Sequence, residues 1–175
     1  MKKVVSIRGA SNAYSYGGVV QQKEAGEKVA NMTPINERKI TINFNADTAA
    51  AMTWSFRPQQ TKIDLVPGET ALAFYTAKNP TDRQVIGVST YNVIPFEAGQ
   101  YFNKIQCFCF DEQMLNPKEE VHMPVMFYID PEFADDPAMD NVKDITLSYT
   151  FFEAKPGMEI PLPGFMRKQR ATQTT

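Results

Sequence analysis

Short stretches in which apolar and polar residues alternate one by one recur along most of this sequence. In the first of them, Ile40, Ile42 and Phe44 alternate with polar neighbours. Successive side chains of a β-strand point to opposite faces of a sheet, so this pattern predicts a half-buried strand. Comparable stretches follow at 54–56, 61–66, 69–77, 85–94, 121–130 and 144–154. Turn signals such as Pro67-Gly68 separate them. The sequence also predicts a polar turn at 111–120 and an acidic loop with two prolines at 130–142.

This series of short strands, with almost no helical periodicity between them, predicts an all-β fold. The regular spacing favours an immunoglobulin-like antiparallel β-sandwich. We expect this domain to occupy residues 38–155 of the 175. Residues 1–37 form an N-terminal segment with a short helix that ends before Thr33-Pro34. Residues 156–175 contain three prolines and form an extended or disordered tail.

Another stretch, Tyr101 to Gln113, contains Cys107 and Cys109, the only two cysteines of the chain. If this stretch is a strand, both cysteines share one face, and the phenylalanines at 108 and 110 share the other. Alternate residues of a strand lie roughly 6.5 Å apart at Cα, so a disulfide between them would be strained. The thiols can form a metal or redox site, or they can be packing residues, because cysteine is often buried.

Charge and motifs exclude several functional classes. A net charge of −2 gives no electrostatic footprint for nucleic acid. No stretch of about 18 apolar residues predicts a membrane span. The sequence has no glycine-rich phosphate loop and no hydrolase or zinc-protease motif, and it contains a single histidine, His122. We therefore expect a protein that is not an enzyme.

The cysteine pair suits one metal better than others. Two soft thiolates favour Cu(I), which accepts few ligands, over Zn(II), which requires four. Met114, Met123 and Met126 lie nearby in sequence and could add thioethers, although methionine is more often core filler. His122 is more often a surface or packing residue. If two chains joined their cysteine strands, four thiolates could bridge two cuprous ions, which predicts a metal-linked homodimer.

Several longer motifs carry a resemblance to a known family. They are FNAD (44–47), FRPQQ (56–60), VPGETALAFY (66–75), AKNPTDR (77–83), GVSTYNV (87–93), PFEAGQYFNKIQCFCF (95–110), MPVMFYIDPEF (123–133) and ITLSYTFFEAK (145–155). Together they cover about residues 38–155, and the KIQCFCF motif is highly specific. The chain resembles the CtaG-type copper-delivery assembly factors of cytochrome c oxidase.

The resemblance implies a function and a location. It implies that Cys107 and Cys109 bind Cu(I), and that the protein delivers copper to the CuB site during oxidase assembly. The implied partners are a donor copper chaperone and the oxidase subunit that carries CuB. The implied location is the mitochondrial inner membrane, on the side of the intermembrane space.

Three features depart from the family pattern. Family members carry an N-terminal transmembrane helix and a further cysteine before a glycine pair. Here no such helix is predicted, and Ser11 stands near that cysteine position, ahead of Gly17-Gly18. His122 stands where the family tends to have an acidic residue. The competing hypothesis is an immunoglobulin-like structural or interaction module of a mitochondrial complex, without copper-transfer activity.

Overall fold

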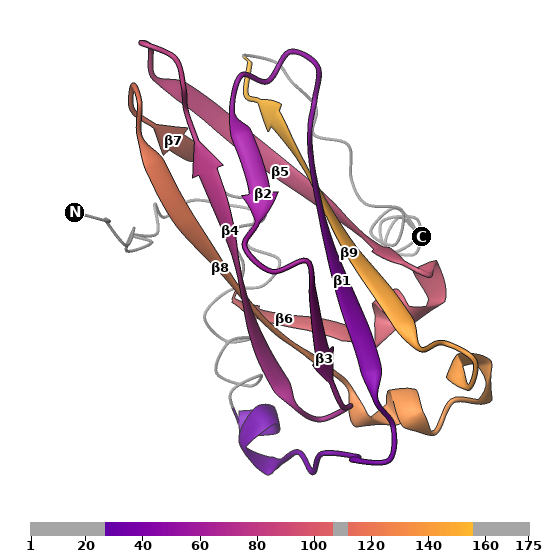
Figure 1. Ribbon diagram of the computed structural model, residues 1–175. Coiled ribbons are helices and arrows are strands. Elements are labelled where there is room, and N and C mark those ends of the chain that lie inside the picture. Colours follow the sequence, from indigo (N-terminus) through magenta and orange to yellow (C-terminus); the bar gives the residue numbers. More distant parts are fainter. Residues whose placement is uncertain (1–26, 107–111, 156–175) are drawn as a thin grey trace, which may run out of the picture.

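A computed structural model describes residues 27–106 and 112–155, and it shows a sandwich of two β-sheets (Figure 1). The five-stranded sheet has the order β3 (Lys62–Leu65), β1 (Ile40–Thr48), β9 (Asp144–Glu153), β5 (Val85–Ile94), β7 (Gln113–Leu115). The four-stranded sheet has the order β2 (Ser55–Pro58), β4 (Thr70–Lys78), β8 (Glu120–Ile129), β6 (Phe102–Gln106). The all-β sandwich expected from the sequence is confirmed.

Strand pairing follows the antiparallel expectation with one exception. Neighbouring strands in both sheets run antiparallel except for β1 and β9, which are parallel, with Thr41 opposite Asp144 and Thr48 opposite Phe151. The first and last strands of the sandwich therefore lie side by side within the five-stranded sheet.

The alternation of the sequence places the core between the two sheets. On β9, Ile145, Leu147, Tyr149 and Phe151 are fully buried, as their spacing predicts. Aromatic rings fill much of this space. Tyr75 of β4 stacks on Phe56 with 5.0 Å between ring centroids and meets Tyr149 edge-on at 5.1 Å. The first contact lies within the four-stranded sheet and the second joins the two sheets, and both add specific geometry to apolar burial.

Two loops contain more structure than the sequence analysis assigned to them. Residues 111–120 were expected to form a polar turn, but Gln113–Leu115 is a strand, β7, because it pairs with the open edge of β5 and buries Leu115. The acidic loop after β8 contains the 3-10 helices η2 (Pro131–Ala134) and η3 (Pro137–Met139). Asp130 and Asp136 cap them by accepting hydrogen bonds from Glu132 N and Ala138 N. A third such helix, η1 (Phe96–Gln100), precedes β6.

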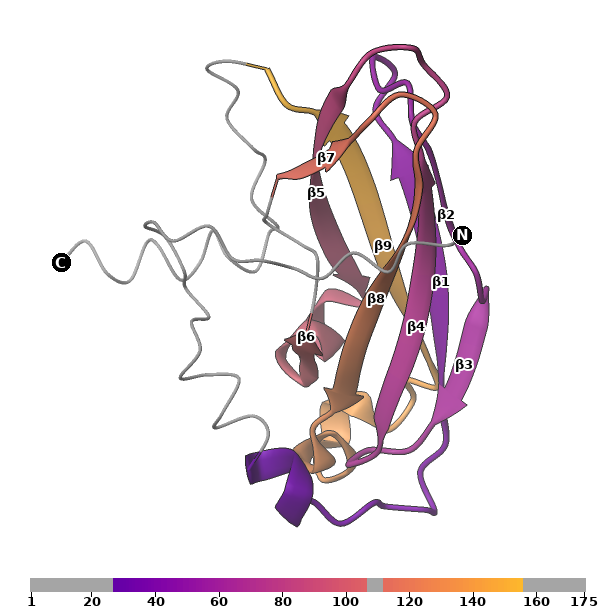
Figure 2. The same ribbon diagram turned by 90° about the vertical axis from the view of Figure 1, so that its left-hand side faces the viewer.

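The segment before β1 is attached to the end of the sandwich where η2 and η3 lie (Figure 2). Residues 27–31 are helical, and the helix ends before Thr33-Pro34, as expected. Lys28 Nζ lies 2.7 Å from Asp130 Oδ2, and Ile35 N donates to Pro67 O. Gly68 has a φ of +86°, and a Cβ atom at this position would lie 2.7 Å from Thr33 O and 3.2 Å from Pro34 Cα. A side chain at this position would displace the attached segment.

Candidate metal site

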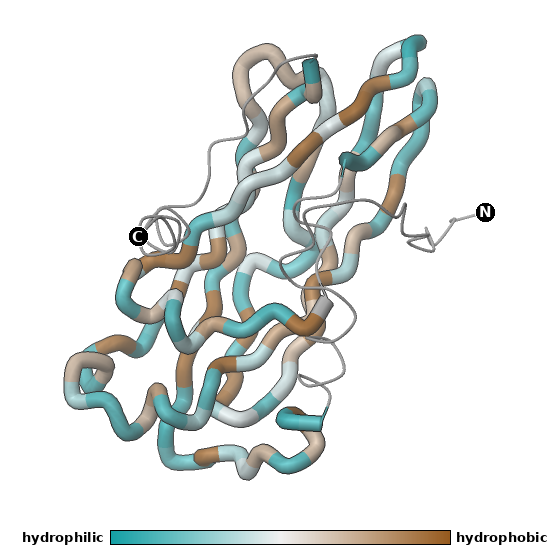
Figure 3. The backbone as a smooth tube through the Cα atoms, turned by 180° about the vertical axis from the view of Figure 1, so that it is seen from behind, coloured by the Kyte–Doolittle hydropathy of each residue, from teal (hydrophilic) through white to brown (hydrophobic). Residues whose placement is uncertain are grey.

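The cysteine pair lies between two strands that belong to different sheets. β6 ends at Gln106 on the edge of the four-stranded sheet, and β7 begins at Gln113 on the edge of the five-stranded sheet. Figure 3 views the molecule from the side on which these two edges lie. The part of the expected cysteine strand that the structure describes is β6, which ends at Gln106. Cys107 and Cys109 lie outside the described residues, so their shared face stays a prediction.

A β-bulge interrupts β6 directly before the cysteines. Lys104 pairs with Phe127 and Gln106 with Met126, so Ile105 is an extra residue in the ladder. A bulge changes which side of the strand the following residues occupy. The faces that Phe102 and Lys104 occupy therefore do not determine which face the cysteines occupy. Bulges of this kind are common at sheet edges and beside functional sites.

Lys104 is a basic residue near the cysteines that the sequence analysis did not single out. Its Nζ lies 2.6 Å from the centroid of the Tyr91 ring. Tyr91 belongs to β5, so the Lys104 side chain reaches from β6 of one sheet to the other sheet. Burial lowers the pKa of Lys104 well below its usual value, and burial also raises the pKa of Tyr91. The signal in the sequence was the alternation of β6, which places Lys104 on the same side as the buried Phe102.

The three methionines considered as extra ligands occupy different places. Met123 is a core residue of β8, with 4% of its surface exposed. Met114 is 55% exposed on the outer face of the five-stranded sheet. Met126 is half-buried on the opposite outer face, across from Gln106. Since Met114 and Met126 lie on opposite faces of the sandwich, they do not approach one another.

His122 belongs to a polar network on the outer face of the four-stranded sheet. Its Nδ1 lies 2.6 Å from Gln59 Nε2 and 3.2 Å from Thr76 Oγ1. Both contacts hold the His122 ring within this network. His122 lies four residues along β8 from Met126, roughly 13 Å at strand spacing. The structure therefore does not group His122 with the end of β6 that leads to the cysteines.

Among residues 27–106 and 112–155, no three histidine, aspartate or glutamate side chains converge in an arrangement that could hold a metal ion. In the same part of the chain, no helix is long and apolar enough to cross a membrane. The thiols of Cys107 and Cys109 thus remain the candidate ligands that the sequence supplies.

Comparisons with known proteins agree with the family resemblance. The family model described as cytochrome c oxidase assembly protein CtaG/Cox11 matches residues 8–153. The chain is 66% identical over 154 residues to the mitochondrial cytochrome c oxidase assembly protein COX11 of Bos taurus, covering 88% of this chain and 55% of the relative. The human protein of the same name is 67% identical over 149 residues, which cover 85% of this chain and 54% of the relative.

The match to a more distant relative covers a similar share of both chains. The cytochrome c oxidase assembly protein ctaG of Reclinomonas americana is 51% identical over 142 residues, which cover 80% of this chain and 78% of the relative. The chain spans about half the length of the mammalian relatives that it matches. By the extent of the family match and these identities, the chain belongs to the CtaG/Cox11 family of cytochrome c oxidase assembly proteins.

Proposed function

We propose that this protein is a copper chaperone, which binds Cu(I) through Cys107 and Cys109 and delivers it to the CuB site during cytochrome c oxidase assembly. The observation that carries the proposal is a Cys-x-Cys pair, formed by the only two cysteines of a chain that belongs to an oxidase assembly family. We place this activity on the intermembrane-space side of the mitochondrial inner membrane. The names of the mammalian relatives, which are mitochondrial, support the organelle, and the membrane and its side are part of the proposal.

The chemistry of the donor set suits copper as cargo. Thiolates are soft ligands, and two of them satisfy Cu(I) but supply only half of a tetrahedral zinc site. Binding requires the deprotonated thiols, so each bound ion releases up to two protons and copper affinity falls as the pH is lowered. The copper stays cuprous during transfer, so the proposed activity is ligand exchange and moves no electrons.

Delivery requires that another protein reach the bound ion. The strands on either side of the cysteine pair, β6 and β7, are each the outermost strand of a sheet, which supports access from the side of the sandwich. Ligands of the acceptor subunit would replace the two thiolates one after the other, through an intermediate that shares the ion. A donor copper chaperone would load the site by the same exchange in reverse. Two chains together could hold two cuprous ions with four thiolates.

Replacing both cysteines tests the assignment. The double variant Cys107→Ser/Cys109→Ser is expected to keep the fold and to lose Cu(I) in competition with a chromophoric Cu(I) chelator under anaerobic conditions. Circular dichroism and thermal unfolding of both proteins provide the control for folding. Near-stoichiometric Cu(I) retained by the double variant would show that these ligands are wrongly assigned.

Thiol reactivity separates the chaperone from a structural or interaction module. We expect both thiols of the reduced protein to react quickly with an alkylating reagent, and one equivalent of Cu(I) to protect them. Two thiols that react slowly, with or without copper, would favour the module and contradict the proposed function.

A further inference from the structure

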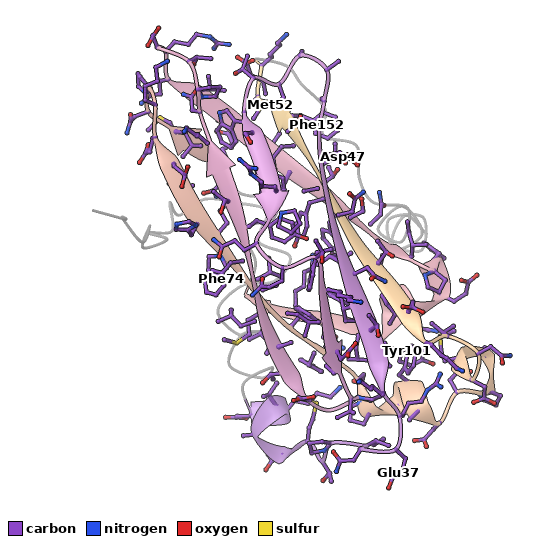
Figure 4. The ribbon with its side chains drawn as sticks, in the orientation of Figure 1. Glu37, Asp47, Met52, Phe74, Tyr101 and Phe152 are labelled. Carbon is purple, nitrogen blue, oxygen red and sulfur yellow. The ribbon has the colours of Figure 1, made fainter. Side chains whose placement is uncertain are left out.

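Exposed apolar side chains gather along one edge of the five-stranded sheet. Among the described residues, five large hydrophobic side chains are exposed, and four of them lie on or directly after β5 and β7. They are Ile86 and Ile94 of β5, Met114 of β7, which pairs with Ile86, and Phe96 at the start of η1. Phe152, labelled in Figure 4 near the end of β9, is half-buried on the same outer face as Ile86. We call these five residues the edge strip.

Two outward residues between the ends of the edge strip are more deeply buried than a sheet edge explains. Val88 and Thr90 alternate with inward residues of β5 such as Tyr91, so they point away from the core. Only 2% of Val88 and 7% of Thr90 are exposed. β7 pairs with β5 only as far as Gly87, so no described strand flanks these two residues on the outer side. A further segment of chain over this part of the edge would account for their burial.

The C-terminal tail, residues 156–175, starts at one end of the edge strip. Just before the tail, Ala154 N donates to Ile86 O at 2.8 Å. From Ile86 to Ile94 at the far end, the strip is about 27 Å long at strand spacing. The first ten or so residues of the tail span up to about 33 Å when extended. The tail is therefore long enough to follow β5 from one end of the strip to the other.

The sequence of the tail matches the edge strip in character. Met158, Ile160 and Leu162 occupy alternate positions, so an extended tail presents them on one face. The prolines between them exclude a helix and are tolerated in an extended segment at a sheet edge. A second apolar pair, at 165–166, then reaches the level of Ile94. Both apolar parts of the tail thus meet apolar parts of the strip.

The charges at the far end of the strip are also complementary to the tail. Figure 1 shows that β5 ends on the same side of the sandwich as β9 begins, and the exposed carboxylates of Glu97 and Asp144 belong to this end. Directly after its apolar residues, the tail carries the basic residues Arg167, Lys168 and Arg170. A tail that follows β5 brings these residues to the two carboxylates. Exposed ion pairs contribute little energy, so they select the direction of the tail rather than hold it in place.

We propose that the C-terminal tail folds back along β5 and packs its apolar side chains onto the edge strip. The chain then covers its own open edge. An uncovered apolar sheet edge is a place where other chains can pair or aggregate. The tail therefore protects the protein from association through this edge, and the contact does not require copper.

Trypsin measures the docking of the tail, because it cleaves after the basic residues at 167, 168 and 170. Leu162→Asp places a charge in the apolar contact of the reduced, copper-free chain of 175 residues. Cleavage in the tail should become at least about fivefold faster, since its rate follows the fraction of molecules with an undocked tail. Thr174→Asp is the matched control, because it adds the same charge beyond the apolar residues, and it should be cleaved at the wild-type rate.

The edge strip is tested by the corresponding change on β5. Ile94→Asp should accelerate cleavage of the tail as Leu162→Asp does, because it places a charge in the same contact. Leu72→Asp is its control, since Leu72 is 42% exposed on the other sheet, and should leave the rate unchanged. Sedimentation velocity measures the protection of the edge: Leu162→Asp should associate at concentrations at which Thr174→Asp stays dispersed. Circular dichroism checks the fold of each variant.

Cross-linking locates the docked tail. A zero-length carbodiimide reagent should join Lys168 to Glu97 or Asp144 in the wild type and not in Leu162→Asp. Wild-type cleavage rates in folded Leu162→Asp and Ile94→Asp, equal acceleration in the controls, or links from Lys168 only to carboxylates at the other end of β5 would overturn the proposal. Every variant should keep its copper affinity in chelator competition, so a failure of this inference leaves the proposed function intact.

Discussion

Gly87 of β5 is a position where a single added methyl group should destabilise the sandwich. A Cβ atom built on Gly87 would lie 2.8 Å and 2.9 Å from two carbons of the Trp54 ring, and 2.9 Å from Met52 Cε. Trp54 is 3% exposed and its ring centroid lies 5.4 Å from that of Phe151. The indole is buried and packs against Phe151, so it has little freedom to move away. We expect Gly87→Ala to force a shift of Trp54.

Two opposing effects determine the magnitude. Overpacking of a core costs about 1–3 kcal/mol. The φ of Gly87 is not positive, so alanine fits the backbone. Alanine also lowers the conformational entropy of the unfolded chain, which raises the free energy of unfolding by about 0.4–1 kcal/mol. The midpoints of these ranges, about 2 and about 0.7 kcal/mol, leave a net loss in the free energy of unfolding of about 1.3 kcal/mol. At about 2–4 °C per kcal/mol for a chain of this size, the melting temperature should fall by roughly 3–5 °C.

Urea and thermal unfolding measure this effect, and fluorescence reports on it directly because Trp54 is the only tryptophan. Gly99→Ala is the matched control: its nearest neighbour would be Val93 Cβ at an ordinary 3.7 Å, so we expect little change or a small gain in stability. Unchanged or increased stability of Gly87→Ala, with an unshifted Trp54 emission spectrum, would refute the steric argument.

Three further predictions address other parts of the molecule. Gly68→Ala should lower the free energy of unfolding by at least about 1–2 kcal/mol in urea titrations, because φ is +86° and a Cβ would lie 2.7 Å from Thr33 O; wild-type stability would contradict this. The Tyr101 hydroxyl donates to Asp136 Oδ2 at 2.6 Å, and this bond holds the pKa of Asp136 below its usual value. Its contribution to the free energy of unfolding is therefore fully present above the pKa of the unfolded chain, and is lost as the pH falls through the lower pKa of the folded protein. Tyr101→Phe should therefore weaken the acid dependence of the urea midpoint, and an identical pH profile in both proteins would show that the hydrogen bond does not contribute. His122→Ala should leave the competition for Cu(I) unchanged, because Nδ1 of His122 is engaged by Gln59 and Thr76; a clear loss of copper affinity would place His122 at the site.

Local alternation was sufficient to predict the long strands. On β9 the inward set from Ile145 to Phe151 follows from the sequence alone, because a ten-residue strand repeats its pattern several times. β7 was missed because three residues provide no repeat, and its conformation depends on pairing with β5. The parallel pairing of β1 and β9 was also not predictable, since residues far apart in sequence determine it.

The capped turns after β8 were missed although their signal was present. Asp130-Pro131 and Asp136-Pro137 each combine an N-cap residue with proline at the first helical position. Around the candidate site, the chemistry of the thiol pair could be inferred from residue types, whereas the geometry could not. The bulge at Ile105 and the change of sheet between Gln106 and Gln113 depend on long-range pairing, which leaves no periodic signal in the sequence.

The parallel pairing of β1 with β9 has a consequence for how the chain folds during synthesis. β1 emerges early from the ribosome, and until β9 follows it can pair only with β3, as an antiparallel pair of the kind that is marginal in water by itself. Completion of the five-stranded sheet therefore waits until the chain has been made through Glu153. During that interval the apolar side chains of Ile40, Ile42 and Phe44 have no finished core to enter. A chain with such exposed strands is prone to aggregate until its last strand is in place.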